Sequence, residues 1–306
     1  MEGKRYAVLL CAEDSEYVRK KYGGYFGVFI RMLAEEGETW DVYKVASGDF
    51  PEEDGDLDLY DGFVITGSCN DAHGNDAWIH RLITLIQKLD SMKKKILGIC
   101  FGHQINKLVI PMYSSDRTGF EASIDDEKRE NLSTRLFNVD VARGGNESIN
   151  ADGYLSCIGG KVNRSPTGWD VGVRSITLSS SSPLSPTSLM REIPTKAEII
   201  AWSEKTGIEM FRFGDHIMGI QGHPEYTIDI LLHLIDRLVQ RDLILIDQID
   251  GMGNNKDKLQ EVKTKHDLLN VFLGSFCGGA RAKVVLREPD REAWKKLCTS
   301  FLKSRS

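Results

Sequence analysis

The sequence lacks the features of membrane-spanning, disulfide-stabilised and nucleic-acid-binding proteins. No apolar run in its 306 residues approaches the ~20 residues that cross a bilayer. The 39 Lys and Arg are outnumbered by 45 Asp and Glu, and the net charge of -6 argues against a nucleic-acid or anionic-membrane partner. Six cysteines are scattered without paired spacing or a C-x-x-C, which argues against a disulfide framework and a zinc site.

What is present suits a globular chain with its own core. Hydrophobic residues make up 41% of the sequence and charged residues 27%. The first residues lead directly into an apolar, strand-like segment at 6–11, so we expect no targeting segment. Isolated cysteines in such a chain are typical of reduced thiols, and we therefore expect a cytosolic protein.

The first 104 residues alternate between two periodicities. Apolar or alternating runs predict strands at 6–11, 40–45, 62–66 and 95–99. Helical spacing of apolar residues predicts helices at 24–35 and 77–94. This order predicts an α/β fold with a doubly wound, flavodoxin-like, mostly parallel sheet, whose sites lie at the carboxyl ends of the strands.

The second half is less regular. Strands of a mixed or antiparallel extension are expected at 173–178, 198–201, 209–213 and 217–221, and amphipathic helices at 227–241 and 290–303. Two stretches interrupt the pattern. We expect one domain over 1–250 with an irregular, disordered insert at 106–158, a second irregular insert at 251–287, and a C-terminal helix within 288–306 that packs on the domain.

Cys100 lies in Gly98-Ile99-Cys100-Phe101-Gly102, the pattern of a nucleophile elbow. The sharp turn from strand to helix crowds the backbone and needs glycines, and the helix N-terminus favours a thiolate. The backbone N–H of Phe101 would then face an oxyanion formed at the attacked carbonyl. The alternative is an inert cysteine packed at the end of a strand.

A thiol nucleophile needs a base, and His223 in Gln221-Gly222-His223-Pro224-Glu225-Tyr226 is the best candidate. Pro224 favours an extended His223, which would place Glu225 on the same face to orient the imidazole. His103 is predicted to be a packing or polar-surface residue of the elbow helix. Gly67, just beyond a strand, is either a second oxyanion donor or an ordinary turn glycine.

Together these motifs resemble class I glutamine amidotransferases, with Gly-x-Cys-x-Gly-x-Gln at 98–104 and His-Pro-Glu at 223–225. Further matches, at 4–104, 168–172, 217–226 and from 288 onward, are similar to the plant γ-glutamyl peptidase branch. The resemblance implies hydrolysis of the γ-glutamyl amide bond of glutathione or its conjugates, such as glucosinolate and phytoalexin precursors. It calls for a small-molecule substrate and for no metal or organic cofactor, and it leaves any protein partner unknown.

The resemblance also implies a role for each matched residue. Cys100 would form a γ-glutamyl thioester, while His223 would move the protons with Glu225 behind it. Gly67 and Phe101 would bind the oxyanion through backbone N–H groups. Gln104 would help to hold the glutamyl group.

The sequence departs from the family pattern at three places. Gly159-Gly160-Lys161 comes only after the stretch that begins at Asn106, a His-containing loop is missing between 189 and 192, and residues 252–286 replace a short acidic helix. Retained or skipped exon segments in the gene model are one explanation, and lineage-specific insertion is the other.

Three alternatives for function remain open at this point. The chain could be a glutaminase that supplies ammonia to a separate synthetase, since no ATP-binding P-loop follows in it. It could be a catalytically inactive isoform with a binding role. It could also be a flavodoxin-like domain in which Cys100 is unreactive.

Overall fold

The computed structural model describes residues 3–52, 55–109, 135–140, 170–178, 197–203, 207–240 and 291–304. Its main sheet has the strand order β2-β1-β3-β4-β10-β9-β8-β7. The parallel strands are β1 (Arg5–Leu9), β2 (Thr39–Tyr43), β3 (Gly62–Ile65), β4 (Lys95–Ile99) and β10 (Ile217–Ile220). The antiparallel extension is β9 (Gly207–Phe213), β8 (Ala197–Ser203) and β7 (Thr177–Leu178). The predicted mostly parallel α/β sheet is confirmed.

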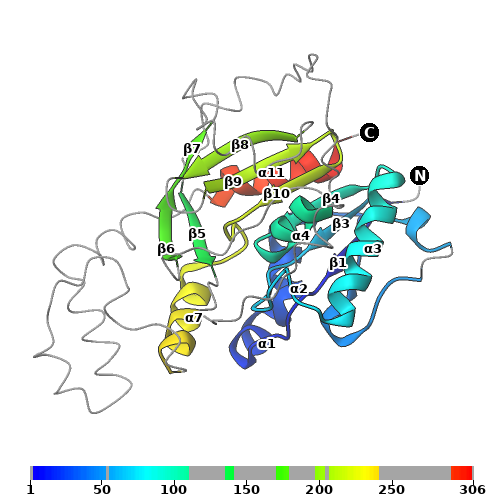
Figure 1. Cartoon of the computed structure of the whole chain (residues 1–306). Helices are drawn as coiled ribbons and strands as arrows, with labels where there is room; N and C mark the ends of the chain where they lie inside the picture. The colour runs from blue at the N-terminus through cyan, green and yellow to red at the C-terminus, as the bar shows by residue number, and fades with distance from the viewer. Residues whose placement is uncertain are drawn as a thin grey trace, which may run out of the picture.

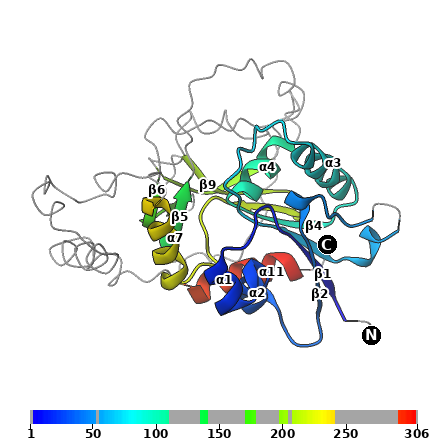
Figure 2. The same ribbon diagram turned by 90° about the horizontal axis from the view of Figure 1, so that it is seen from below.

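Helices cover both faces of this sheet, as Figures 1 and 2 show. One face carries α3 (Ala77–Ser91) and α4 (Phe101–Val109), and the other carries α1 (Glu16–Tyr22), α2 (Gly24–Leu33) and α11 (Arg291–Lys303). The core is correspondingly split. Leu82 and Ile105 belong to one buried cluster, and Phe29 and Trp294 to the other. Strands buried on both faces explain why 6–11 and 96–99 contain no charged residue.

The strand order reverses where the functional residues are expected. From β1 the chain passes outward to β2 and then returns to β3 on the other side of β1. Such a reversal in a parallel sheet leaves an opening at the carboxyl ends of the strands. Leu9, Ile65, Gly98 and Gly219 lie side by side in register across β1, β3, β4 and β10. The loops that follow these four strands therefore start from one edge.

The structure adds one helix that the sequence analysis did not predict. Helix α1 begins after Ser15, whose side chain accepts a hydrogen bond from the Val18 N–H, and ends at Gly23, which has a left-handed φ of 78°. A serine cap and a C-terminal glycine are the usual signals of a short helix. Two 3-10 turns, η1 (Val45–Ser47) and η2 (Leu57–Leu59), were also not predicted.

The strand predicted at 173–178 is divided. Its first part lies in β6 (Asp170–Ser175), which pairs antiparallel with β5 (Arg135–Asp140) in a second sheet, and its end is β7 of the main sheet. Ile176 separates the two strands and buries its side chain in the second core cluster. A single apolar residue anchored in the core thus lets the chain change sheets.

The predicted inserts fall mostly outside the described residues. Helix α4 continues through Asn106 to Val109, and β5 lies within the same predicted insert at 106–158. The second insert, 251–287, is wholly outside the described residues.

The C-terminal helix closes the second core. Trp294, Cys298 and Leu302 of α11 are buried against the sheet, beside α2. Lys303 at its end binds the Glu38 carboxylate at 2.9 Å. We propose that α11 is the last element of the domain formed by residues 1–250.

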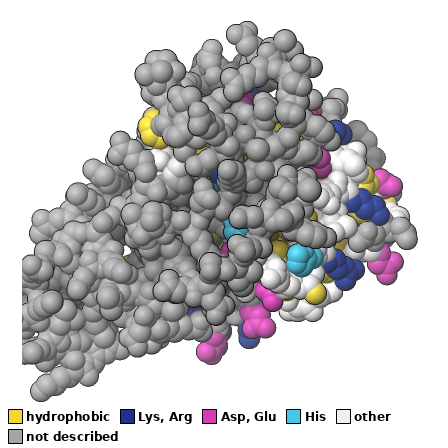
Figure 3. Space-filling model, in the orientation of Figure 1, with side chains coloured by type: hydrophobic (Ala, Val, Ile, Leu, Met, Phe, Trp, Pro, Cys, Tyr) yellow, Lys and Arg dark blue, Asp and Glu magenta, His cyan; other side chains and the backbone are white. Residues whose placement is uncertain are grey.

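The surface shows mixed charge. On the described part of the face in Figure 3, cationic and anionic side chains are interspersed rather than gathered by sign. Val42 and Leu59 are the large hydrophobic residues found exposed in the described ranges. Among the helices placed by the structure, none combines the length and hydropathy needed to span a membrane.

A polar cluster ties α1 to the start of α7 (Ile228–Gln240), the helix predicted at 227–241. Asp229 accepts hydrogen bonds from Tyr17 at 2.6 Å, from Tyr22 at 2.8 Å and from the Lys21 ammonium at 2.8 Å. Partial burial raises the pKa of Asp229, but hydrogen bonds from Lys21, Thr227 and the two tyrosines outweigh it and lower the pKa well below its ordinary value. The carboxylate therefore joins segments more than 200 residues apart.

We expect Asp229→Asn to lower the free energy of unfolding by about 1–2 kcal/mol at pH 7, because charge-assisted hydrogen bonds are lost from a partly exposed site. The native pKa lies below the unfolded value of ~4, so this stabilisation is complete above pH ~4 and is lost as the pH falls further. Urea denaturation at pH 7 and pH 3 measures both effects.

The matched control is Glu16→Gln, which breaks the exposed Lys20 pair on the same helix and should cost no more than ~0.5 kcal/mol. Equal losses for the two variants at pH 7 would contradict the role given to Asp229.

Candidate active site

Cys100 lies at the turn between β4 and α4 with a left-handed φ of 53°. Only one other non-glycine residue in the described ranges, Lys93, has a positive φ. The Cys100 N–H donates to the Ile220 carbonyl at 2.8 Å, and the Cys100 carbonyl accepts from the Gln104 N–H at 3.0 Å. Such a conformation costs ~1–3 kcal/mol and persists only where neighbours fix it. The geometry is that of a strained nucleophile elbow.

The two glycines of the elbow are required by close packing. A Cβ on Gly98 would lie 2.4 Å from the Gly102 carbonyl oxygen, and one on Gly102 would lie 2.5 Å from the carbonyl oxygen of Ile65. Both clashes are with backbone, which cannot move aside cheaply. The Gly-x-Cys-x-Gly spacing therefore lets α4 begin directly against β3 and β4.

His223 reaches the same edge from the neighbouring strand. β10 pairs with β4 in parallel, and His223 follows it by three residues. Its Nδ1 lies 2.7 Å from Glu225 Oε1, and both residues are buried. The pairing was predicted from an extended backbone, but that reason is wrong. A turn brings the two side chains together, with Pro224 and Glu225 at its centre and the Tyr226 N–H donating to the His223 carbonyl at 3.3 Å.

The imidazole of His223 also hydrogen-bonds to the side chain of Cys100. Burial lowers the pKa of His223, but the charge of Glu225 and the Cys100 sulfur outweigh it and raise the pKa to about 10. The ring is therefore cationic at neutral pH, and a cationic imidazole stabilises a thiolate beside it. Sulfur, imidazole and carboxylate form a continuous chain of contacts.

An aromatic stack holds the imidazole plane. The Tyr226 ring lies 4.1 Å from that of His223 with an interplanar angle of 10°, and Tyr25 of α2 packs against Tyr226 at 6.2 Å. The sequence analysis missed this role for Tyr226. Its only signal was its position in the turn after Glu225, where the ring returns over the imidazole.

Gly67 lies against both reacting groups. A Cβ at this position would be 2.7 Å from His223 Cε1 and 3.5 Å from Cys100 Cβ. Phe101, the first residue of α4, is buried with its ring 5.5 Å from that of Trp78. The loop after β3 and the start of α4 thus flank the sulfur, and the oxyanion role of the two N–H groups stays a prediction.

Gln104, predicted to bind the substrate, is half-buried one turn beyond Cys100. Its Nε2 is 3.4 Å from Gln221 Oε1, and Gln221 Nε2 is 3.8 Å from Cys100 Sγ. Gln221 therefore contacts the sulfur and the predicted binding residue together. The sequence analysis did not assign it a role, although it directly precedes Gly222 and His223.

His103 is a packing residue. It is buried on α4 with its ring edge-on to Phe211 at 5.0 Å. Burial, together with the charge of Lys107, lowers the pKa of His103 to about 3, so the ring is neutral. The packing prediction agrees with this position, and the polar-surface alternative does not.

The remaining chemistry of the described residues is limited. They contain no group of three or more His, Cys, Asp and Glu side chains placed to hold a metal ion. Cys11, Cys69, Cys100 and Cys298 are free thiols, of which Cys69 is exposed. The arrangement around Cys100 is suited to nucleophilic attack by sulfur with proton transfer by His223.

Comparisons with known proteins show what the whole chain is similar to. No protein-family model matches the chain. Gamma-glutamyl peptidase 5 of Arabidopsis thaliana is 38% identical over 323 aligned positions, which cover 100% of this chain and 98% of the peptidase. Gamma-glutamyl peptidase 3 of the same plant is 36% identical, and the aligned positions cover 98% of this chain and 97% of that peptidase. A solved glutamine amidotransferase from Thermotoga maritima covers 99% of this chain and 100% of its own at 13% identity, with a TM-score of 0.44.

We expect Glu225→Gln to slow alkylation of Cys100 by iodoacetamide at pH 7 by about tenfold or more. Without the carboxylate, burial lowers the pKa of His223, and the ring loses its proton. At a pH above the pKa, each unit by which the pKa falls lowers the protonated fraction of His223 tenfold. Mass spectrometry of the labelled peptides gives the rate at each cysteine.

Exposed Cys69 is the internal control, and its rate should not change. An unchanged rate at Cys100, or a parallel fall at both cysteines, would contradict the role given to Glu225.

Proposed function

Because the chain belongs to the γ-glutamyl peptidase family, we propose that it hydrolyses the γ-glutamyl amide bond of glutathione or glutathione conjugates. Members of this family are hydrolases, and their name supports γ-glutamyl hydrolysis in general. The proposal adds the substrate class and assigns the chemistry to Cys100, through a thioester.

One observation carries the assignment to residues. The Cys100 side chain, on a left-handed elbow, hydrogen-bonds to a buried imidazole that is in turn paired with Glu225 at 2.7 Å. An unreactive structural cysteine does not need a strained backbone or a charged histidine beside it. The buried Glu225 supports a positive charge on His223, which is the state required for donating a proton to a leaving amine.

The proposed reaction has two steps. The Cys100 thiolate attacks the γ-carbonyl carbon, and the N–H groups of Gly67 and Phe101 stabilise the oxyanion. The C–N bond then breaks as His223 gives its proton to the amine, which leaves a γ-glutamyl thioester. A water molecule, deprotonated by His223, attacks the thioester and releases glutamate and the thiolate. The sum is one amide and one water converted to glutamate and a free amine.

Gln104 and Gln221 are proposed to hold the glutamyl group during these steps. Their amides are 3.4 Å apart beside the sulfur, and each offers a donor and an acceptor. A glutamyl α-carbon carries both an ammonium and a carboxylate, which such a pair of amides can satisfy.

We also propose a reducing compartment, the cytosol, as the site of the reaction. Four described cysteines are free, and Cys11 and Cys298 are buried where oxidation would disturb the core. A small-molecule substrate is consistent with this assignment.

We expect protein quenched in acid during turnover of glutathione to carry one glutamyl group on Cys100. Cys100→Ala should abolish both the adduct and hydrolysis, whereas Cys69→Ala should retain both, because the contact with His223 is made by Cys100. Intact-protein and peptide mass spectrometry locate the adduct.

Equal turnover of free glutamine would support the glutaminase alternative instead. Hydrolysis that persists in Cys100→Ala would contradict the proposed nucleophile.

We expect Gly67→Ala to reduce kcat for γ-glutamyl hydrolysis about 100-fold, because its methyl group would displace His223 from the sulfur and a shift of ~1 Å is enough for such a loss. The neighbouring Ser68→Ala is the control and should keep wild-type kcat. Normal turnover by Gly67→Ala would contradict the packing of this loop against the imidazole.

A further inference from the structure

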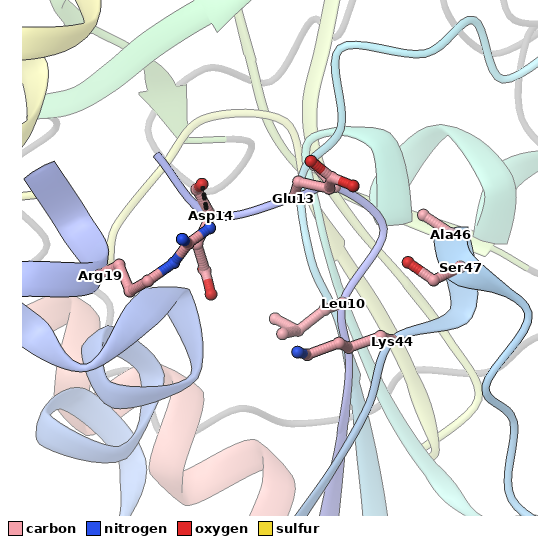
Figure 4. Close-up of a pocket in the computed structure, with 8 residues that line it drawn as sticks. Leu10, Glu13, Asp14, Arg19, Lys44, Ala46 and Ser47 are labelled. Carbon is pink, nitrogen blue, oxygen red and sulfur yellow. Dashed lines mark hydrogen bonds between the residues drawn. The ribbon is translucent and has the colours of Figure 1, made fainter. Parts of the chain in front are cut away.

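A cavity outside the Cys100 site lies at the carboxyl ends of β1 and β2, and its volume is about 210 Å³. Leu10 forms its apolar floor, and charged side chains from the loop after β1, from α1 and from the end of β2 surround it (Figure 4). Pockets that enclose a whole ligand measure ~300–1,000 Å³, so this cavity suits one end of a substrate rather than all of it.

Four charged side chains line the cavity, namely Glu13, Asp14, Arg19 and Lys44. In Figure 4 the Lys44 side chain extends into the open space, the Arg19 guanidinium is turned toward the backbone of Asp14, and the Glu13 carboxylate points away from both. The Asp14 carboxylate is occupied elsewhere, since its Oδ1 accepts from the Tyr25 N–H at 2.6 Å where α2 begins. Arg19 and Lys44 are thus the cationic groups of a lining that also contains the carboxylates of Glu13 and Asp14.

Neither cation forms a salt bridge within the described part of the protein. Arg19 donates to the backbone carbonyl of Asp14 at 3.4 Å, and no carboxylate of the described residues forms an ion pair with Arg19 or Lys44. A guanidinium steadied by a carbonyl and an ammonium on a flexible stem are suited to binding a carboxylate.

The cavity and the sulfur lie on one edge of the sheet. Leu9, Ile65 and Gly98 are in register across β1, β3 and β4, so the ends of β1 and β4 are two strand spacings, or ~10 Å, apart. The Cys11 N–H donates to Thr66 Oγ1 at 3.0 Å, which joins the loop that lines the cavity to the loop that carries Gly67. Two residues of an extended peptide substrate span ~7 Å of this distance, and the Lys44 side chain reaches across the rest.

We propose that this cavity, through Arg19 and Lys44, binds the terminal carboxylate of the amine portion of the γ-glutamyl substrate. The inference rests on the proposed function and adds a preference to it. A γ-glutamyl dipeptide that ends in a free carboxylate, as in glutathione, is favoured over a γ-glutamyl amide or anilide that ends in a neutral group. Arg19 and Lys44 then determine specificity without touching the reacting atoms.

The test compares glutathione with its glycine-amide form, which differs only in the terminal charge. Kinetics of the wild type, of Lys44→Gln and of the double variant with Arg19→Gln give kcat and KM for each substrate. Lys20→Gln is the control, because Lys20 lies next to Arg19 on α1 but pairs with Glu16. We expect the double variant to raise KM for glutathione about tenfold or more, and to change neither constant for the amide.

Binding to Cys100→Ala, measured by calorimetry, makes the result independent of turnover. Tighter binding of glutathione than of its amide, lost when Lys44 and Arg19 are also replaced, supports the carboxylate site. Equal binding of the two forms overturns it, even if hydrolysis is normal. If neither form is cleaved by the wild type while binding still depends on the two cations, the proposed function fails and the carboxylate site stands.

Discussion

The hydrogen bond from the Cys100 N–H to the Ile220 carbonyl is the constraint on which the site depends. It extends the ladder between β4 and β10 by one step beyond the last strand residue of β4. The thiol and the imidazole therefore start from neighbouring points of a rigid sheet, although more than 100 residues separate them. A site built on strand ends keeps its geometry better than one built on free loops.

Strain and charge are concentrated at this point. Cys100 adopts a left-handed backbone that only the packing of Gly98 and Gly102 permits, so the neighbouring layers must be in place before the sulfur is presented. The buried Glu225 keeps His223 charged against the cost of desolvation. Burying any one of these charged groups alone is unfavourable. The contacts among the sulfur, the imidazole and the carboxylate offset this cost of desolvation.

The sequence was most informative where one local pattern determines the structure. Mostly apolar runs identified β1, β3 and β4, because these strands are buried on both faces. The glycines of the elbow indicated a tight turn, which depends on residues close together in the sequence. Cys100 could be named for this reason, and His223 was then chosen as its base because it also follows a predicted strand. In the structure, the side chains of Cys100 and His223 meet beside the paired strands β4 and β10.

Other features depend on tertiary contacts and were missed. The Tyr226 ring acquires its role only when the turn folds back over His223, and Gln221 only when β10 lies beside β4. The division of 173–178 at Ile176 is set by the core, not by local propensity. Helix α1 was different, since its Ser15 cap and Gly23 were visible in the sequence and only its short length concealed it.

The charge state of His223 tests the account most directly, because the nucleophile, the base and the buried carboxylate all depend on it. Nitrogen-15 NMR of the histidine rings, with His223 assigned through a His223→Gln variant, follows that charge as the pH is raised. The account predicts that His223 stays protonated through neutral pH and loses its proton only near pH 10. A His223 that titrates near the ordinary value of ~6.5 would contradict it.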